Sequence, residues 1–535
     1  MTATTPRSNG ALRPNSTLDF AERDRLATNH GSPSASAPAG GSPSPQNSSG
    51  WPLDDEPDPG DAYRDRTVSK AWGWTGAGSG RSSNVESAQI YQGTTTQVCG
   101  LFPFAVASGA APRGVPVGRH LLTAEPVGLD PAEYLNDGLI TNTGVWLMGQ
   151  PGIGKSTIAK RLSLGLAGFG IPTVVPGDVK GEYTRLVEGL GGKVWRIGRG
   201  LNSLNPLDAG PLRSALRQTH GEVHARLLET VRARRLSLLE ALIVIVRRLP
   251  MTVTERRLLG AALDLAVQSD PDREPTIPQV VQVLRDAPEL LLEIAACATR
   301  LDFARDARDL LNTLGLLCDG AIRGIFDRPS TVTAELDAPA LSLDISACAD
   351  DDDEVVAAAM LCSWAWTGAL IDGAKAIGAV RNVLRIQDEL WRALRVAPGL
   401  VELSDRVTRL NRHRGEISIQ VTHSLDDLEA LPTQEDRMKA RGMANRCGVV
   451  ILGGMAERDI HAMSGISPMT DQEAALVRSW AAPPSWVSAN GRAHPGRGKY
   501  LIKSGERMGI PVQMDLVGAE RQLYYTDEKW VRGQR

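Results

Sequence analysis

The sequence lacks the patterns that mark a disulfide framework or a structural metal site. No two of its six cysteines form a Cys-x-x-Cys pair, and they are scattered over 535 residues as Cys99, Cys297, Cys318, Cys348, Cys362 and Cys447. A reduced chain explains this spacing better than disulfides or zinc. The eight histidines include no His-Glu-x-x-His motif. We therefore expect no protein-ligated structural metal.

An excess of basic charge is also missing. Lys and Arg number 59 against 62 Asp and Glu, which gives a net charge of −3. A protein that coats nucleic acid or an acidic membrane would be strongly basic, so this class is excluded, although a local basic surface is not. The first ten residues, MTATTPRSNG, contain no apolar core, so no standard signal peptide is expected.

Long hydrophobic runs are few, and one that needs explanation is the uncharged stretch Val355–Ile371. It has 17 residues, is rich in alanine, and contains Ser363, Thr367 and Gly368. A membrane-spanning helix needs about 20 predominantly apolar residues. The stretch predicts a buried helix, with membrane contact as the alternative.

The N-terminal part is poor in residues that build a core. Between Gly31 and Gly50, 15 of 20 residues are Gly, Ser or Pro, and an acidic, proline-rich segment follows. Such a composition buries too little apolar surface to offset the entropy of ordering. We expect residues 1–95 to form a disordered tail, either a solvated linker or the carrier of a short partner-binding motif.

Residues 96–211 and 326–535 have the pattern of an α/β core. Helical spacing is predicted for 155–168, and short apolar or alternating runs predict strands at 144–149, 172–176, 193–197, 340–345, 383–386, 416–421, 448–452, 499–502 and 512–516. Strands that alternate with helices indicate a parallel sheet covered by helices.

Residues 212–325 separate the two parts of this core and predict only helices. Apolar residues recur there at helical spacing. Thr252 with Glu255 and Thr276 with Gln279 match capping boxes, which mark helix N-termini. We expect an all-helical insertion whose apolar stripes form core.

The strongest motif is a phosphate loop that follows the strand at 144–149. It matches Gly-x-x-x-x-Gly-Lys-Ser/Thr, and the predicted nucleotide-binding residues are Gly149, Gln150, Pro151, Gly152, Ile153, Gly154, Lys155, Ser156 and Thr157. Glycines allow backbone N–H groups to surround phosphate oxygens at a helix N-terminus. Lys155 would reach the β- and γ-phosphates and Ser156 would ligate Mg²⁺. ATP and Mg²⁺ are therefore the expected cofactors.

An adjacent acid pair ends the strand at 383–386. Asp388 would hold Mg²⁺, and Glu389 would polarise the attacking water. Neighbouring Asp and Glu are often only solvated surface residues. Their place on a strand downstream of the phosphate loop favours the catalytic interpretation.

Several further segments resemble one family. The residues are Pro176-Gly-Asp-Val-Lys-Gly-Glu-Tyr183, Leu204-Asn-Pro-Leu-Asp208, Phe326-Asp-Arg-Pro-Ser330 and Asp388-Glu-Leu-Trp391. In this order they resemble the TraC-like ATPases of conjugative type IV secretion, in the HerA–FtsK group of P-loop motors. The resemblance covers residues 100–530. It implies a RecA-like ATPase domain that works as a hexameric ring.

The resemblance also implies roles for individual residues. Arg412 falls at the family's finger position, with Arg409 and Arg414 as neighbouring candidates, and would complete the site of the next subunit. His423 stands where the family has a sensor glutamine, and a core histidine is the alternative. Asp178 is expected near the nucleotide or the subunit junction, or else in a structural ion pair.

The function implied is an ATP-hydrolysing motor of conjugative DNA transfer or type IV secretion. The alternatives are a HerA/FtsK-type DNA translocase inside the cell and an ATP-binding scaffold with little turnover. The expected partners are further copies of the chain, secretion-channel proteins and DNA. The expected location is the cytoplasm, at or near the inner face of the cell membrane.

Overall fold

The computed structural model describes most of the chain from residue 113 onward. The described residues are 113–320, 322–333, 338–379, 382–396, 400–402, 415–482 and 494–524. The predicted tail, residues 1–95, lies outside them, as do Arg409, Arg412 and Arg414.

The described residues contain an 11-stranded sheet in the order β2-β1-β11-β10-β9-β3-β8-β7-β4-β6-β5. The strands are β1 (Val115–His120), β2 (Pro126–Leu129), β3 (Gly144–Met148), β4 (Thr173–Asp178), β5 (Lys193–Arg196), β6 (Ala340–Asp344), β7 (Val383–Gln387), β8 (Glu416–Thr422), β9 (Val449–Leu452), β10 (Lys499–Ser504) and β11 (Ile510–Gln513). Neighbours from β9 to β5 pair in parallel, and the pairs from β9 to β2 are antiparallel. The expected α/β class is confirmed.

Burial on both faces explains why β3 is apolar throughout. In β3, Val145 and Leu147 join one hydrophobic cluster, whereas Trp146 and Met148 join a second cluster on the opposite face. Parallel sheets are covered by helices on both sides, so a strand such as β3 has no solvent-facing side that would require polar residues. The phosphate-loop strand is thereby held at the centre of the sheet, between β8 and β9.

Three strands differ from the prediction: β1 and β2 were not expected, and β11 begins and ends earlier than expected. No strand was expected before residue 144, but β1 and β2 form a hairpin there. β1 contains Pro116 and Gly118, and its register shifts between them, which conceals the strand pattern. The last strand lies at Ile510–Gln513 and not at 512–516.

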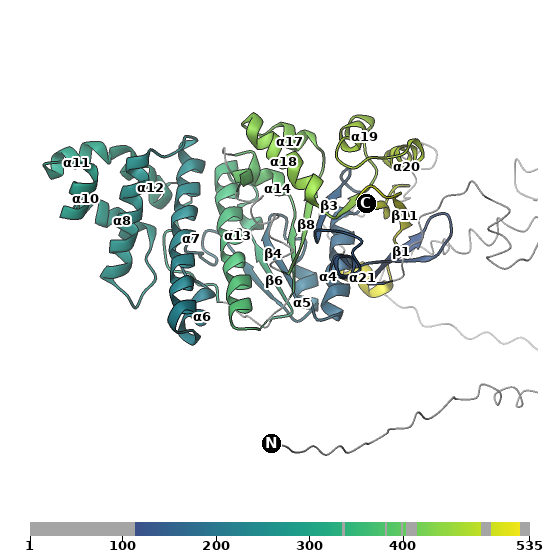
Figure 1. Cartoon of the computed structure of the whole chain (residues 1–535), viewed down its shortest axis with the longest axis horizontal. Coiled ribbons are helices and arrows are strands. Elements are labelled where there is room, and N and C mark those ends of the chain that lie inside the picture. The colour runs from purple at the N-terminus through teal and green to yellow at the C-terminus, as the bar shows by residue number, and fades with distance from the viewer. Residues whose placement is uncertain are drawn as a thin grey trace, which may run out of the picture. The chain divides into compact units, whose positions relative to one another are not determined.

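The helices of the α/β core cover both faces of this sheet (Figure 1). They are α3 (Pro131–Asn136), α4 (Lys155–Gly168), α5 (Thr184–Gly189), η1 (Ser346–Cys348), α13 (Asp353–Ala376), α14 (Leu390–Leu394), α17 (Asp426–Glu429), α18 (Gln434–Arg446), α19 (Glu457–Ser464), α20 (Asp471–Ala481) and α21 (Gly518–Tyr524). α4 begins at Lys155, as the sequence predicted.

Between β5 and β6 the described elements are all helices. They are α6 (Leu212–Gln218), α7 (Gly221–Arg247), α8 (Val253–Ser269), α9 (Ile277–Asp286), α10 (Glu289–Ala295), α11 (Arg300–Asp306) and α12 (Arg308–Asp319). Both capping boxes are present, at Thr252 with Glu255 and at Thr276 with Gln279. Figure 1 shows α7 beside α13, with α8 and α10–α12 beyond α7.

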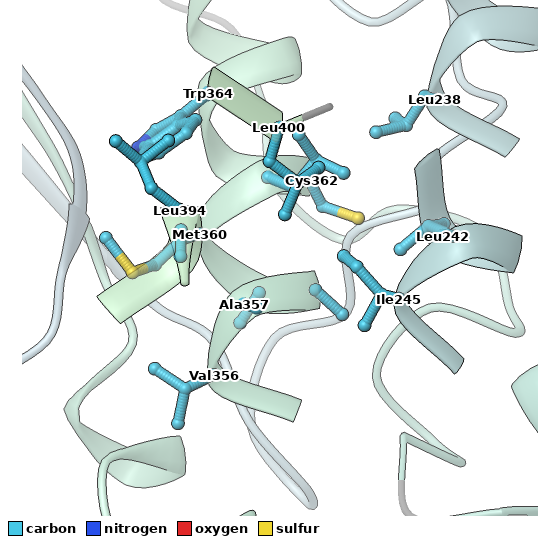
Figure 2. Packing of buried hydrophobic residues seen from close by; sticks show 14 of the residues in the cluster. Leu238, Leu242, Ile245, Val356, Ala357, Met360, Cys362, Trp364, Leu394 and Leu400 are labelled. Atoms are coloured by element: carbon cyan, nitrogen blue, oxygen red, sulfur yellow. The ribbon is translucent and has the colours of Figure 1, made fainter. Parts of the chain in front are cut away.

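The uncharged stretch Val355–Ile371 lies within α13. This helix is long and apolar enough to cross a membrane, but 83% of its most apolar window is buried inside the protein. Figure 2 shows why: Leu242 and Ile245 of α7 lie on one side of α13, while Met360 and Trp364 extend toward Leu394. The Trp364 indole also donates to the Pro176 carbonyl of β4 at 3.2 Å. A helix that is apolar all round is buried all round, and α13 packs as a core helix.

Candidate functional site

The phosphate loop connects β3 to the N-terminus of α4. Gly152 and Gly154 have φ values of +83° and +100°, a region that favours glycine. A Cβ at Gly154 would also come within 2.8 Å of the Tyr500 hydroxyl. The loop therefore needs glycine at these positions, and its backbone presents N–H groups at a helix N-terminus, where anions bind.

The phosphate loop is hydrogen-bonded to residues that follow β9 and to residues that precede or belong to β10. Gln150 N donates to Gly454 O at 2.9 Å, and Gly498 N donates to Ile153 O at 3.0 Å. The buried Tyr500 donates its hydroxyl to Gly154 O at 2.6 Å. Tyr500 was missed from the sequence because it lies 346 residues from its partner, so no local pattern reports the contact.

Lys155 is buried at the centre of the site. Its Nζ donates to Gly149 O at 2.8 Å and to Gln150 O at 3.1 Å, and lies 2.8 Å from His423 Nδ1. Burial lowers the pKa of Lys155 to about 8, although the charges of Asp388 and Glu389 oppose the shift. The ammonium is therefore poorly solvated and bound to neutral polar atoms. This favours replacement of these partners by a phosphate oxygen when nucleotide binds.

Asp388 follows β7 and meets the phosphate loop directly. Its Oδ2 accepts from Ser156 Oγ at 3.2 Å and from Tyr183 OH at 3.0 Å. Burial raises the pKa of Asp388, and the charge of Glu389 adds to the shift. A carboxylate and a hydroxyl are oxygen ligands of the kind that Mg²⁺ prefers, and a bound cation would favour the ionised carboxylate. The two predicted ligands lie together and fit this ion.

Glu389 is buried and strained. It has φ +53° and ψ 32°, the left-handed region that is unfavourable for any residue with a Cβ. Its Oε1 lies 2.8 Å from His423 Nε2 and forms an ion pair with Lys180, while Oε2 accepts from Trp391 Nε1 at 2.6 Å. Burial alone would raise the pKa of Glu389, but His423 and Lys180 lower it to about 2. The carboxylate is therefore ionised at neutral pH.

His423, just after β8, bridges the lysine and the glutamate. A lysine ammonium is only a donor and a carboxylate only an acceptor. The neutral ring thus accepts from Lys155 at Nδ1 and donates to Glu389 from Nε2. The histidine side chain is 27% exposed, and its role as the sensor stays a prediction.

Asp178 is hydrogen-bonded to the backbone of the loop that follows β4. Its carboxylate accepts from three backbone N–H groups of its own loop, at Lys180, Glu182 and Tyr183, over 3.3, 3.1 and 2.8 Å. Burial raises the pKa of Asp178 to about 7, although these hydrogen bonds oppose the shift. This geometry favours a role in shaping the loop. Direct contact of Asp178 with nucleotide stays a prediction.

The finger prediction falls outside the described residues. Arg409, Arg412 and Arg414 all precede Gly415, where the described chain resumes before β8. Among the described residues, no group of three or more His, Cys, Asp or Glu side chains could hold a metal ion. Two residues in the site, Tyr183 and Trp391, had no role assigned from sequence, although both lie in segments that carry the family resemblance.

The buried lysine predicts how nucleotide binding depends on pH. Because Lys155 has a pKa of about 8 and phosphate favours its charged form, binding above that pH requires uptake of a proton. The Kd of a non-hydrolysable ATP analogue should rise by less than about twofold between about pH 7.5 and 8 and approach a rise of about tenfold per pH unit well above about pH 8. Fluorescence titrations from about pH 7.5 to 9.5 measure this. Lys155→Arg, which stays charged, should give a flat profile; a flat wild-type profile would contradict the shift.

Comparison with known proteins supports the fold. No protein-family model and no curated protein matches the sequence. The structure of VirB4 of Thermoanaerobacter pseudethanolicus is similar, with a TM-score of 0.59 and 18% identity, over 78% of this chain and 100% of that one. The conjugative coupling protein TrwB bound to a non-hydrolysable ATP analogue has a TM-score of 0.44 and 13% identity, over 76% of this chain and 90% of TrwB. The VirB4 match confirms, at the level of the fold, the resemblance to conjugative type IV secretion ATPases.

Proposed function

We propose that the protein is an ATP-hydrolysing motor of conjugative DNA transfer or type IV secretion that works as a hexameric ring. One observation carries the proposal: Lys155, Asp388, Glu389 and His423 come together around a phosphate loop. The VirB4-like fold adds support. Structures of the coupling protein TrwB contain an ATP analogue or ADP with Mg²⁺. For this chain we propose ATP and Mg²⁺ as the cofactors.

The chain's own residues supply a complete set of roles for hydrolysis. The loop N–H groups and Lys155 would bind the phosphates, Glu389 would orient and polarise the attacking water, and His423 would contact the γ-phosphate. Ser156 and Asp388 would hold Mg²⁺, which neutralises phosphate charge when bound. Arg412, or its neighbour Arg409 or Arg414, would act on the nucleotide of the adjacent subunit.

The proposed setting follows from the same family. The partners are other copies of this chain, channel proteins of the secretion system, and DNA. Because the net charge is only −3, DNA contact would be confined to the pore of the ring or handed to partners. The proposed location is the cytoplasm, peripheral to the inner face of the cell membrane.

ATP hydrolysis measured against protein concentration tests the motor. If a neighbouring arginine completes each site, the rate per subunit should rise as rings form, because charge on the transferred phosphoryl group is then neutralised. Arg412→Ala should remove this rise, while an exposed control, Arg217→Ala on α6, should keep it. Absence of hydrolysis at every concentration would reject the motor and favour the scaffold. Strong stimulation by DNA without channel proteins would favour the intracellular translocase.

A further inference from the structure

The connection between β4 and α5 reaches both acids of the site. Residues 178–183, which we call the acid-binding loop, carry Lys180 to Glu389 and Tyr183 to Asp388. The two contacts are made by side chains only three positions apart in one loop. The state of this loop is thereby linked to the geometry of both carboxylates.

The acid-binding loop is anchored at its two ends. At its start, Asp178 accepts hydrogen bonds from three backbone N–H groups of the loop. At its end, Tyr183 is fully buried and packs beneath the Lys160 ammonium, 5.5 Å from the ring centroid. A side chain carried by such a rigid segment is pre-organised, so it can hold a partner in one geometry.

The position of Lys180 is better explained by an effect on the Glu389 carboxylate than by a contribution to folding stability. Its side chain is 49% exposed, whereas that of Glu389 is 5% exposed. Ion pairs with a largely solvated partner contribute little to folding, and Glu389 already accepts from Trp391 and His423. Three side chains, those of Lys180, His423 and Trp391, therefore contact the Glu389 carboxylate.

Resting on the function proposed above, we propose that Lys180 is a positioning residue for hydrolysis, which holds the Glu389 carboxylate in the orientation that directs the attacking water. Lys180 and His423 contact the same oxygen, Oε1, from two different segments of the chain. Together they restrict rotation of the carboxylate group. Oε2 then points along a direction set by Trp391 and keeps acceptor capacity for a water molecule.

Steady-state hydrolysis by Lys180 variants tests this role. Lys180→Ala should lower kcat about tenfold or more with little change in KM for ATP, because Lys180 acts on the glutamate and not on nucleotide binding. Lys180→Arg, which keeps a cation at this position, should recover most of the rate. Lys439→Ala is the matched control, since Lys439 also pairs with glutamates but does so on α18.

A double variant separates positioning from a general structural effect. If Lys180 acts through Glu389, then Lys180→Ala should not slow Glu389→Gln any further in single-turnover reactions. An unchanged kcat in Lys180→Ala, failed rescue by arginine, or additive losses in the double variant would overturn the inference. Wild-type activity in the same assay separates the two proposals, since a wild-type protein without hydrolysis rejects the motor itself.

Discussion

Replacement of Glu389 by glutamine is expected to lower kcat for ATP hydrolysis by roughly 10²–10⁴-fold while ATP binding is retained. The Glu389 carboxylate contacts His423, which in turn contacts Lys155, whereas Asp388 accepts a hydrogen bond from Ser156. Glutamine has the same shape but cannot polarise water as an anion does. Its NH2 group, a donor, replaces one of the two acceptor oxygens of the glutamate. Phosphate release and binding of a fluorescent ATP analogue are the two measurements.

The same variant separates a motor from a scaffold. A motor should lose transport together with hydrolysis, whereas a scaffold should keep its function because nucleotide binding persists. Glu188→Gln on α5 is a matched control, since Glu188 is exposed, and should hydrolyse ATP at the wild-type rate. Wild-type hydrolysis in Glu389→Gln would remove Glu389 from the catalytic machinery.

Replacement of Lys155 by alanine is expected to weaken nucleotide binding roughly 10–100-fold and to lower kcat at least about 10²-fold. Lys155 is the buried cation closest to the loop, with Nζ on Gly149 O and Gln150 O. Without it, charge that develops on the transferred phosphate has no cation within the loop. Titration with an ATP analogue and steady-state hydrolysis measure the two effects.

Thermal unfolding distinguishes this loss from misfolding. The lowered pKa of Lys155 shows that burial disfavours its charge. Alanine removes that unfavourable burial along with three hydrogen bonds, so the Tm should change little. Lys439→Ala should leave binding and hydrolysis unchanged. Binding by Lys155→Ala with wild-type affinity would contradict the assignment of the phosphate loop.

Sequence patterns located most of the elements because each pattern is local. The run Gly144–Met148 is apolar throughout, and the helix after it begins where the glycine-rich turn ends at Lys155. Capping at Thr252 and Thr276 likewise depends on residues three positions apart. β1 was missed because Pro116 and Gly118 interrupt its pattern, and its pairing with β11 depends on residues nearly 400 positions away.

The phosphate loop, the Asp388–Glu389 pair and the α/β class could be predicted from the sequence, since these depend on short spacings and on burial of apolar runs. The contacts that connect the residues of the site depend on the fold. Lys155 and His423 are 268 positions apart, and Ser156 and Asp388 are 232 apart. Their meeting follows from parallel strands that end at one edge of the sheet, with β8 between β3 and β7. The same order of strands brings Lys180 to Glu389, a contact that no spacing along the chain predicts.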